Sequence, residues 1–135
     1  MNAGYSGTTL INKLGIRPGY RLAFVQAPVA YEVLLGPLPE GAVDGEAQGP
    51  LDFIQVFATS RSELEAQFPR WKEALAANGM LWVSWPKRAA RVPTDLDENV
   101  VREIGLAHGL VDVKVVAVDD TWSGLKFVYR LRDRR

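Results

Sequence analysis

The chain has 135 residues with 16 basic and 16 acidic side chains, so its formal net charge is zero. This balance does not favour nucleic acid or an anionic membrane as a partner of the whole molecule. The chain contains no cysteine, which excludes disulfides, thiolate nucleophiles and cysteine-based metal sites. It shows no secretory signal pattern and no membrane-spanning apolar run, so we expect a cytoplasmic protein without a membrane partner.

The length corresponds to one domain, so we expect residues 1–135 to form a single unit with residues 1–14 as an N-terminal arm. Residues 36–50 hold four glycines and three prolines without periodicity and are predicted to form a loop. Elsewhere, apolar runs and periodicity predict strands and helices in alternation. In chain order these are a helical turn at 10–14, a strand at 21–26, a helix at 28–35, a strand at 51–58, a helix ending at 78–79, a strand at 79–86, a helix beginning after Thr94 or Asp95, and paired strands at 111–118 and 125–131.

This order predicts an α/β domain of three layers, in which helices cover both faces of a mostly parallel sheet with an antiparallel C-terminal strand. Residues 14–22, 52–56 and 79–83 resemble the first, fourth and fifth strand regions of class I S-adenosylmethionine-dependent methyltransferases. The final strand pair resembles strands six and seven of that family. The resemblance implies a Rossmann-like fold that is truncated where the second and third strands normally lie, at residues 36–50.

Nearly the whole chain also resembles a family of small bacterial proteins whose activity is uncharacterised. The motifs that carry this resemblance are Gly4-Tyr5-Ser6-Gly7, Leu35-Gly36-Pro37-Leu38-Pro39, Thr59-Ser60-Arg61-Ser62-Glu63-Leu64, Trp82-Val83-Ser84-Trp85-Pro86-Lys87, Val92-Pro93-Thr94-Asp95-Leu96, Gly109-Leu110-Val111-Asp112-Val113-Lys114 and Trp122-Ser123-Gly124-Leu125-Lys126. This second resemblance implies a bacterial origin and no particular reaction.

The resemblance implies cofactor binding through two features of the methyltransferase family, and this sequence departs from the family pattern at both. A glycine-rich turn after the first strand lets the backbone approach the methionine part of S-adenosylmethionine, and an acidic residue after the second strand holds the ribose. Here residues 26–30 contain no glycine, and Glu40, Asp44 and Glu46 fall in the predicted loop. We therefore predict that the chain takes no cofactor and that S-adenosylmethionine is disfavoured.

Polar and cationic side chains follow two neighbouring predicted strands, and carboxyl ends of parallel strands meet at one edge of a sheet. A hydroxyl, free backbone N–H groups at a helix start and several cations suit an anion such as phosphate or carboxylate. The alternative is that the serine only caps its helix and that the cations pair with Asp95 or Asp97. The candidate ligand-binding residues are Ser60, Arg61, Trp85, Lys87, Arg88, Thr94 and Trp122.

Catalytic and metal-binding residues are not predicted from this sequence. His108 is the one histidine, and its place at the end of a predicted helix is typical of a C-terminal cap. Without cysteine, a single histidine does not predict a transition-metal site.

Two functional hypotheses remain open. The first is a non-catalytic binding or regulatory module whose strand-end edge takes a small anion or a protein partner. The alternative is a minimal methyltransferase-like enzyme that uses the same edge. Without the second and third strands, the first strand would form a sheet edge, which we expect residues 1–14 or a second copy of the chain to cover.

Overall fold

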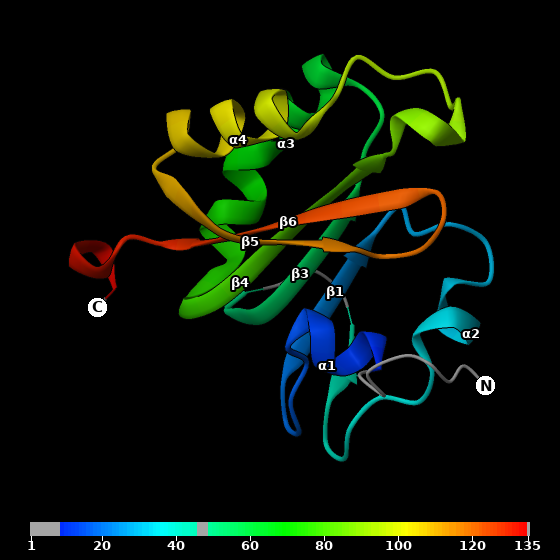
Figure 1. The fold of residues 1–135 in the computed structure, drawn as a ribbon. Coiled ribbons are helices and arrows are strands. Elements are labelled where there is room, and N and C mark those ends of the chain that lie inside the picture. The colour runs from blue at the N-terminus through cyan, green and yellow to red at the C-terminus, as the bar shows by residue number, and fades with distance from the viewer. Residues whose placement is uncertain (1–8, 46–48, 135) are drawn as a thin grey trace.

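Six strands form one mixed sheet in the order β2-β1-β3-β4-β6-β5 in the computed structural model, which describes residues 9–45 and 49–134 (Figure 1). Strands β2, β1, β3 and β4 run parallel, and β6 runs antiparallel to both β4 and β5. This arrangement confirms the predicted fold class. The strands span Arg21–Val25 (β1), Val43–Asp44 (β2), Leu51–Phe57 (β3), Leu75–Pro86 (β4), Leu110–Ala117 (β5) and Trp122–Tyr129 (β6).

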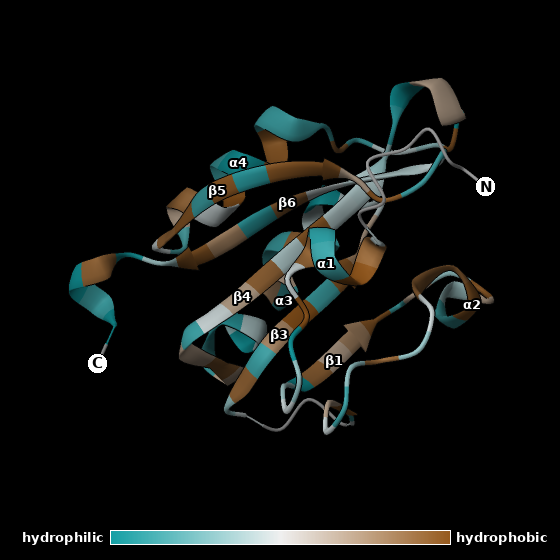
Figure 2. Ribbon diagram, turned by 60° about the horizontal axis from the view of Figure 1, so that its bottom comes forward, coloured by the Kyte–Doolittle hydropathy of each residue, from teal (hydrophilic) through white to brown (hydrophobic). Residues whose placement is uncertain are grey.

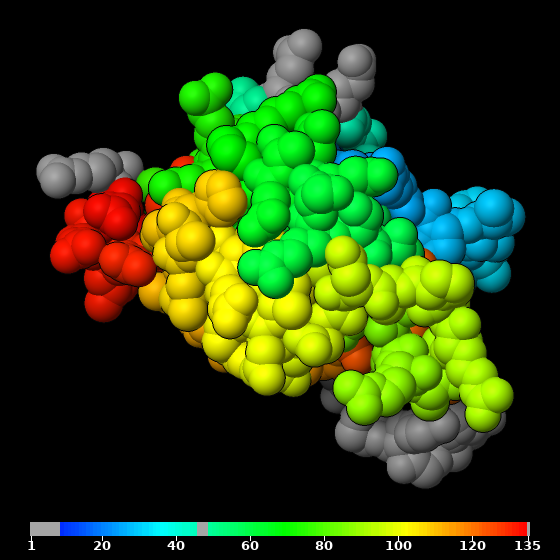
Figure 3. Space-filling view, turned by 90° about the horizontal axis from the view of Figure 1, so that it is seen from above, coloured from blue at the N-terminus to red at the C-terminus, as the bar shows by residue number. Residues whose placement is uncertain are grey.

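Helices cover both faces of the sheet and make three layers (Figure 1). Helices α1 (Leu10–Leu14) and α2 (Tyr31–Leu35) pack on one face. Helices α3 (Arg61–Ala74) and α4 (Glu98–Ala107) pack on the other, side by side in green and yellow in Figure 3. Short 3₁₀ turns lie at Arg88–Ala90 and Leu131–Asp133.

The core has two halves because alternate residues of a strand point to opposite faces of the sheet. On β3, Ile54 and Val56 face α3 and α4, whereas Phe53 and Phe57 face α1 and α2. All four side chains are buried. A strand buried on both faces reads as a continuous apolar run, and for that reason the sequence predicts β3 and the part of β4 from Gly79 onward.

Strand β2 lies inside residues 36–50, which the sequence predicts as a loop. The Val43 N–H donates to the Tyr20 carbonyl over 2.8 Å, and the Gly45 N–H donates to the Leu22 carbonyl over 3.1 Å. This two-residue edge strand is held by backbone hydrogen bonds, and Val43 is exposed. The sequence therefore has no apolar pattern that predicts it. Part of the β1 edge is thus covered by the chain itself.

The sequence predicts instead that residues 1–14 or a second copy of the chain cover the β1 edge. Of the predicted N-terminal arm, residues 10–14 form α1 on the face of the sheet, and residues 1–8 lie outside the described residues. The pairing of Arg21 with Val43 and of Leu22 with Asp44 occupies this stretch of β1 without a second copy of the chain.

Two helix boundaries also differ from the expectation. Helix α3 ends at Ala74, and β4 begins at once with Leu75, which pairs with Leu51 of β3. Helix α4 is capped by Asp97, whose Oδ1 accepts the Val100 N–H over 2.9 Å, rather than by Thr94 or Asp95. Thr94 and Asp95 instead form hydrogen bonds with the segment that follows β3.

Candidate functional site

The turn that joins β1 to α2 lies at the carboxyl edge of the parallel strands and has an unusual backbone. Gln26 has a φ of +57° and Ala30 has a φ of +66°, both in the left-handed region that glycine normally occupies. Holding a non-glycine residue there costs about 1–2 kcal/mol. Such strain persists only where surrounding structure imposes it, and it concentrates at functional sites. The sequence contains no glycine in this turn, yet the backbone takes a glycine-like path twice.

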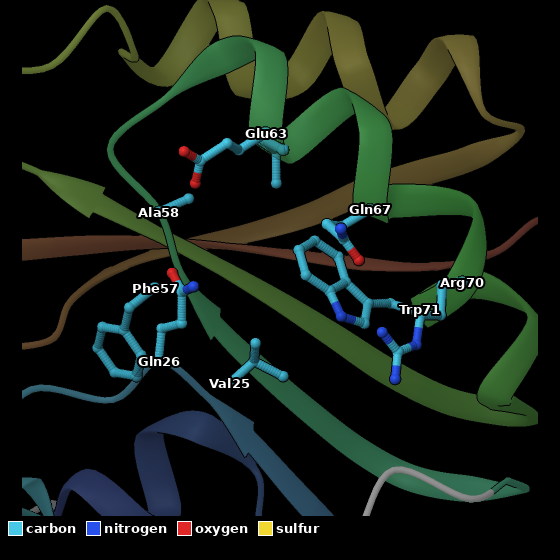
Figure 4. A pocket seen from close by; sticks show the side chains of 9 residues that line it. Val25, Gln26, Phe57, Ala58, Glu63, Gln67, Arg70 and Trp71 are labelled. Carbon is cyan, nitrogen blue, oxygen red and sulfur yellow. The ribbon is translucent and has the colours of Figure 1, made fainter.

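A cavity of about 390 Å³, the larger of two cavities beside this turn, lies between β1, β3 and α3 (Figure 4). Its volume is within the range of about 300–1,000 Å³ that is usual for small-molecule sites. Figure 4 shows the Glu63 side chain extending from α3 toward Ala58, and the Gln67 side chain lying beside the Trp71 ring. The lining residues are Val25 and Gln26 at the end of β1, Phe57 and Ala58 at the end of β3, and Glu63, Leu64, Gln67, Arg70 and Trp71 of α3.

Helix α3 presents its polar groups to this cavity through its periodicity. Glu63, Gln67 and Arg70 follow one another at spacings of four and three residues, which places them on one helical stripe. Ser60 fixes the start of the helix, because its Oγ accepts the Glu63 N–H over 3.3 Å. Trp71 is 8% exposed and forms an indole wall. The cavity therefore combines a carboxylate, an amide, a guanidinium group and an aromatic surface.

Sequence reasoning missed this cavity because it assigned function only to the start of α3, at Ser60 and Arg61, and not to the polar residues farther along the helix. A signal was present: the polar residues Glu63, Gln67 and Arg70 sit beside the apolar stripe of Leu64 and Phe68. Nothing local shows that β1 ends opposite that stripe, since the two elements are separated by α2, β2 and β3.

A smaller cavity of about 150 Å³ lies between the end of β1, α2 and β2. Asp44, the last residue of β2, lines it together with Phe24, Ala27, Tyr31 and Glu32. Partial burial raises the pKa of the Asp44 carboxyl. The sequence suggested that no strand would position an acidic residue of 36–50, but β2 places Asp44 beside the strained turn.

A buried chain of hydrogen bonds ties α2 to the centre of the sheet. The Tyr31 hydroxyl donates to Gln55 Oε1 over 2.7 Å, and Gln55 Nε2 donates to Ser84 Oγ over 3.2 Å. Gln55 and Ser84 are completely buried. Burial raises the pKa of Tyr31 strongly, and the charge of Asp119 raises it further. Because Tyr31 is the first residue of α2, this chain holds the preceding turn in place.

The site predicted from sequence is brought together only in part. Four of its seven residues line a third cavity of about 340 Å³ at the end of β4: Trp85, Lys87, Arg88 and Thr94. The other three lie elsewhere. Ser60 caps α3, Arg61 forms ion pairs with Glu65 and Glu103, and Trp122 packs edge-on against Phe57 on the opposite face of the sheet.

The cations of this third cavity do not form the ion pairs with Asp95 or Asp97 that the alternative interpretation of the sequence predicts. Neither Lys87 nor Arg88 forms an ion pair with a carboxylate among the residues that the structure describes. Asp95 Oδ1 accepts the Arg61 N–H over 2.7 Å, while Asp97 caps α4. These two carboxylates line the cavity but are engaged by helix starts.

Thr94 belongs to the wall rather than to the reactive surface of the third cavity. Its hydroxyl donates to the Thr59 carbonyl over 2.7 Å and accepts the Leu96 N–H over 3.0 Å. Together with the bond between Asp95 and the Arg61 N–H, this fastens the cavity to the segment that follows β3. The same segment leads from Ala58 to Glu63 of the larger cavity, so it links the two cavities, whose lining residues are different.

Within residues 9–45 and 49–134, no group of three or more His, Asp or Glu side chains is arranged to hold a metal ion. Over the same residues, no helix is long and apolar enough to cross a membrane. His108 ends α4 as predicted, and its ring stacks on Phe68 with centroids 4.8 Å apart.

Comparison with known proteins gives structural matches only. No protein-family model and no curated protein sequence matches the chain. A methyltransferase of Aquifex aeolicus described as S-adenosylmethionine-dependent superposes with a TM-score of 0.64 at 15% identity, covering 87% of this chain and 86% of its own. The chain has the fold of a class I S-adenosylmethionine-dependent methyltransferase.

Two further structures support the same fold. Precorrin-6y C5,15-methyltransferase of Geobacter metallireducens gives a TM-score of 0.60 at 11% identity, with 90% of this chain and 86% of that one covered. Aeropyrum pernix fibrillarin, solved with natively bound S-adenosylmethionine, gives 0.55 at 13% identity, with 84% and 68% covered.

These matches overturn two expectations drawn from the sequence. The preference for a non-catalytic module over an enzyme is wrong by this comparison, because the matched structures point toward methyltransferases. The prediction of no cofactor is wrong on the same ground, because they point toward S-adenosylmethionine. Both predictions relied on the missing glycines and on a missing acidic strand end. Strand β2 positions Asp44 and so removes the second argument, and Gln26 shows that the turn takes a glycine-like backbone path without glycine.

Proposed function

We propose that the chain is a small S-adenosylmethionine-dependent methyltransferase-like enzyme that uses the carboxyl edge of its parallel strands. The observation that carries this proposal is the strained turn after β1, which opens onto the 390 Å³ cavity in a sheet of methyltransferase topology. The earlier alternative of a methyltransferase-like enzyme thus becomes the leading hypothesis.

The residues of the larger cavity fit the chemistry of the cofactor. S-adenosylmethionine has hydroxyls on its ribose, a positive sulfur, an amino-acid end and a flat adenine. Glu63 offers a carboxylate for hydroxyls or positive charge, and Arg70 offers a guanidinium group that suits the amino-acid carboxylate. Trp71 and Val25 supply an apolar wall for the adenine. Asp44, on the far side of the turn, is a second carboxylate for the ribose.

The bound cofactor would supply a methyl group carried on a positively charged sulfur. The chain's own part is then to hold an acceptor beside the cofactor and to exclude water. We assign acceptor binding to the third cavity, where Lys87 and Arg88 suit an acceptor with an acidic group and Trp85 forms the wall. The hydrogen bonds from Thr94 and Asp95 to the segment between Ala58 and Glu63 tie this cavity to the larger one and support this division.

Titration with S-adenosylhomocysteine, followed by thermal unfolding and calorimetry, tests the proposal. At a hundred times its dissociation constant the compound should stabilise the chain by about 2.7 kcal/mol, which raises the melting temperature by several degrees. Glu63→Gln should weaken binding at least five-fold. Glu65→Gln, a control on the exposed side of the same helix, should not.

Lys87→Ala should leave the affinity for S-adenosylhomocysteine unchanged, because Lys87 lines the other cavity. The proposal fails if millimolar S-adenosylhomocysteine leaves the melting temperature unchanged. It also fails if Glu63→Gln and Glu65→Gln weaken binding equally.

A further inference from the structure

Two lysines of neighbouring strands lie on the α1 face of the sheet, away from the three cavities, and Arg17 of the loop after α1 is close to them. Lys114 of β5 and Lys126 of β6 are direct cross-strand partners. Side chains in that relation have Cβ atoms about 4.5–5.5 Å apart. Arg17, which follows α1, is near enough for its charge to act on Lys126.

Helix α1 lies against this part of the sheet, as Figure 2 shows. Lys126 pairs with Trp82 of β4, and the Trp82 indole N–H donates to the Leu14 carbonyl over 2.9 Å. Lys114 Nζ donates to the Lys13 carbonyl over 3.4 Å. The end of α1 and the two lysines are therefore held together by contacts that the structure defines.

The cluster is electrostatically unbalanced. Partial burial, and then the charges of Lys114 and Arg17, lower the pKa of Lys126. The four ion pairs found among the described residues involve only Arg61 and Arg102, on the α3 and α4 side of the sheet. Like charges placed directly opposite one another on neighbouring strands are destabilising. An anion bound between these cations would offset their mutual repulsion and so stabilise the folded chain.

We propose that Arg17, Lys114 and Lys126 form a binding site for a phosphate group. A phosphate carries up to two negative charges and several acceptor oxygens, so cations that approach from three elements can each engage it. A planar guanidinium group binds two phosphate oxygens at once, and ammonium groups act as point charges beside it. The phosphate belongs either to a small phosphorylated molecule or to a nucleic-acid backbone, since both present the same group.

This site does not depend on the proposed methyl transfer, because it shares no residue with the three cavities. Its occupation can therefore be measured whether or not S-adenosylmethionine binds.

Titration with inorganic phosphate at constant ionic strength, followed by amide NMR, tests the proposal. Shift changes should cluster at Arg17, Lys114 and Lys126, and the melting temperature should rise beyond the value in sodium chloride. Lys114→Gln should weaken phosphate binding at least five-fold. The same variant should melt at an equal or higher temperature without phosphate, because it removes the repulsion. Arg132→Gln, an exposed cation at the C-terminal turn, is the matched control and should change neither property.

A short single-stranded oligoribonucleotide distinguishes the two sources of phosphate. If it binds at these residues with an affinity that falls steeply with salt, by a log–log slope of about −0.7 per phosphate contacted, the site serves a nucleic acid. If only inorganic phosphate binds there, the site serves a small phosphorylated molecule.

Two results would overturn the proposal. One is the absence of localised shift changes with phosphate. The other is a Lys114→Gln variant that loses stability without phosphate and keeps the wild-type phosphate response, which would make Lys114 a structural residue.

Discussion

At the scale of single residues, the turn after β1 shows that a left-handed backbone does not require glycine. Gln26 and Ala30 both hold a left-handed conformation that costs a non-glycine residue about 1–2 kcal/mol. The fold must offset this cost, and the bonds from Tyr31 to Gln55 and from Gln55 to Ser84 lie directly beside the turn.

Gln26→Gly should therefore keep or raise the stability of the chain. Relief of the left-handed strain offsets the extra freedom that glycine gives the unfolded chain, about 0.4–1 kcal/mol. Ala66→Gly, at an exposed position inside α3, is the control and should lose about 1 kcal/mol. Urea denaturation measures both. Equal losses in the two variants would show that the turn is not strained.

The buried tyrosine gives a pH-dependent prediction. The pKa of Tyr31 is raised by burial above the unfolded value of about 10, so the folded state keeps its proton longer than the unfolded state. Tyr31 makes its full contribution to the free energy of unfolding at pH values well below 10. The contribution falls as the pH rises through 10 and above, because the unfolded state then binds fewer protons than the folded state.

Tyr31→Phe should cost about 1–2 kcal/mol at pH 7, since it leaves the buried Gln55 Oε1 without its donor. The difference between wild type and variant should shrink between pH 9.5 and 11, because phenylalanine does not titrate. Urea denaturation across this range tests the effect, with Tyr20→Phe as a control outside the buried chain. A difference that stays constant above pH 10 contradicts the prediction.

At the scale of elements, α3 and α4 both pack on the same face of the sheet. The apolar stripe of α3 packs into the core, while its neighbouring stripe lines the larger cavity. Helix α4 approaches β6 so closely that a Cβ atom added at Gly105 would overlap the ring of Phe127. The spacing between helix layer and sheet therefore depends on one missing methyl group.

Gly105→Ala should destabilise the chain by about 1–3 kcal/mol despite the better helix propensity of alanine, because the buried Phe127 ring has no room to move aside. The melting temperature should fall by several degrees. Gly45→Ala, where an added Cβ meets nothing within 4 Å, should change it little. A rise in the melting temperature of Gly105→Ala would show that α4 sits farther from β6.

At the scale of the whole molecule, the sheet keeps the methyltransferase order with a very short outer strand. β2 contributes only Val43 and Asp44, yet it positions a carboxylate beside the turn after β1. On the other face, α3 is the helix nearest to the end of β1, and the larger cavity lies between them (Figure 4). A reduced edge thus leaves open the region where a ligand can reach the strand ends.

Local sequence pattern by itself determined the elements whose stability is local or continuous. The apolar runs of β3 and β4 predict buried strands, and Ser60 predicts the start of α3 because its hydroxyl caps the backbone three residues on. The order of these elements then predicts the α/β fold through the handedness of parallel connections.

Only the tertiary structure decided the features that depend on distant parts of the chain. β2 exists through backbone bonds to β1, and the left-handed turn at Gln26 is imposed by its surroundings. The larger cavity joins Val25 to Trp71, and the phosphate site joins Arg17 to Lys126. Non-local pairing and the convergence of side chains leave no local pattern, because each residue's neighbours in sequence are not the groups it meets in space.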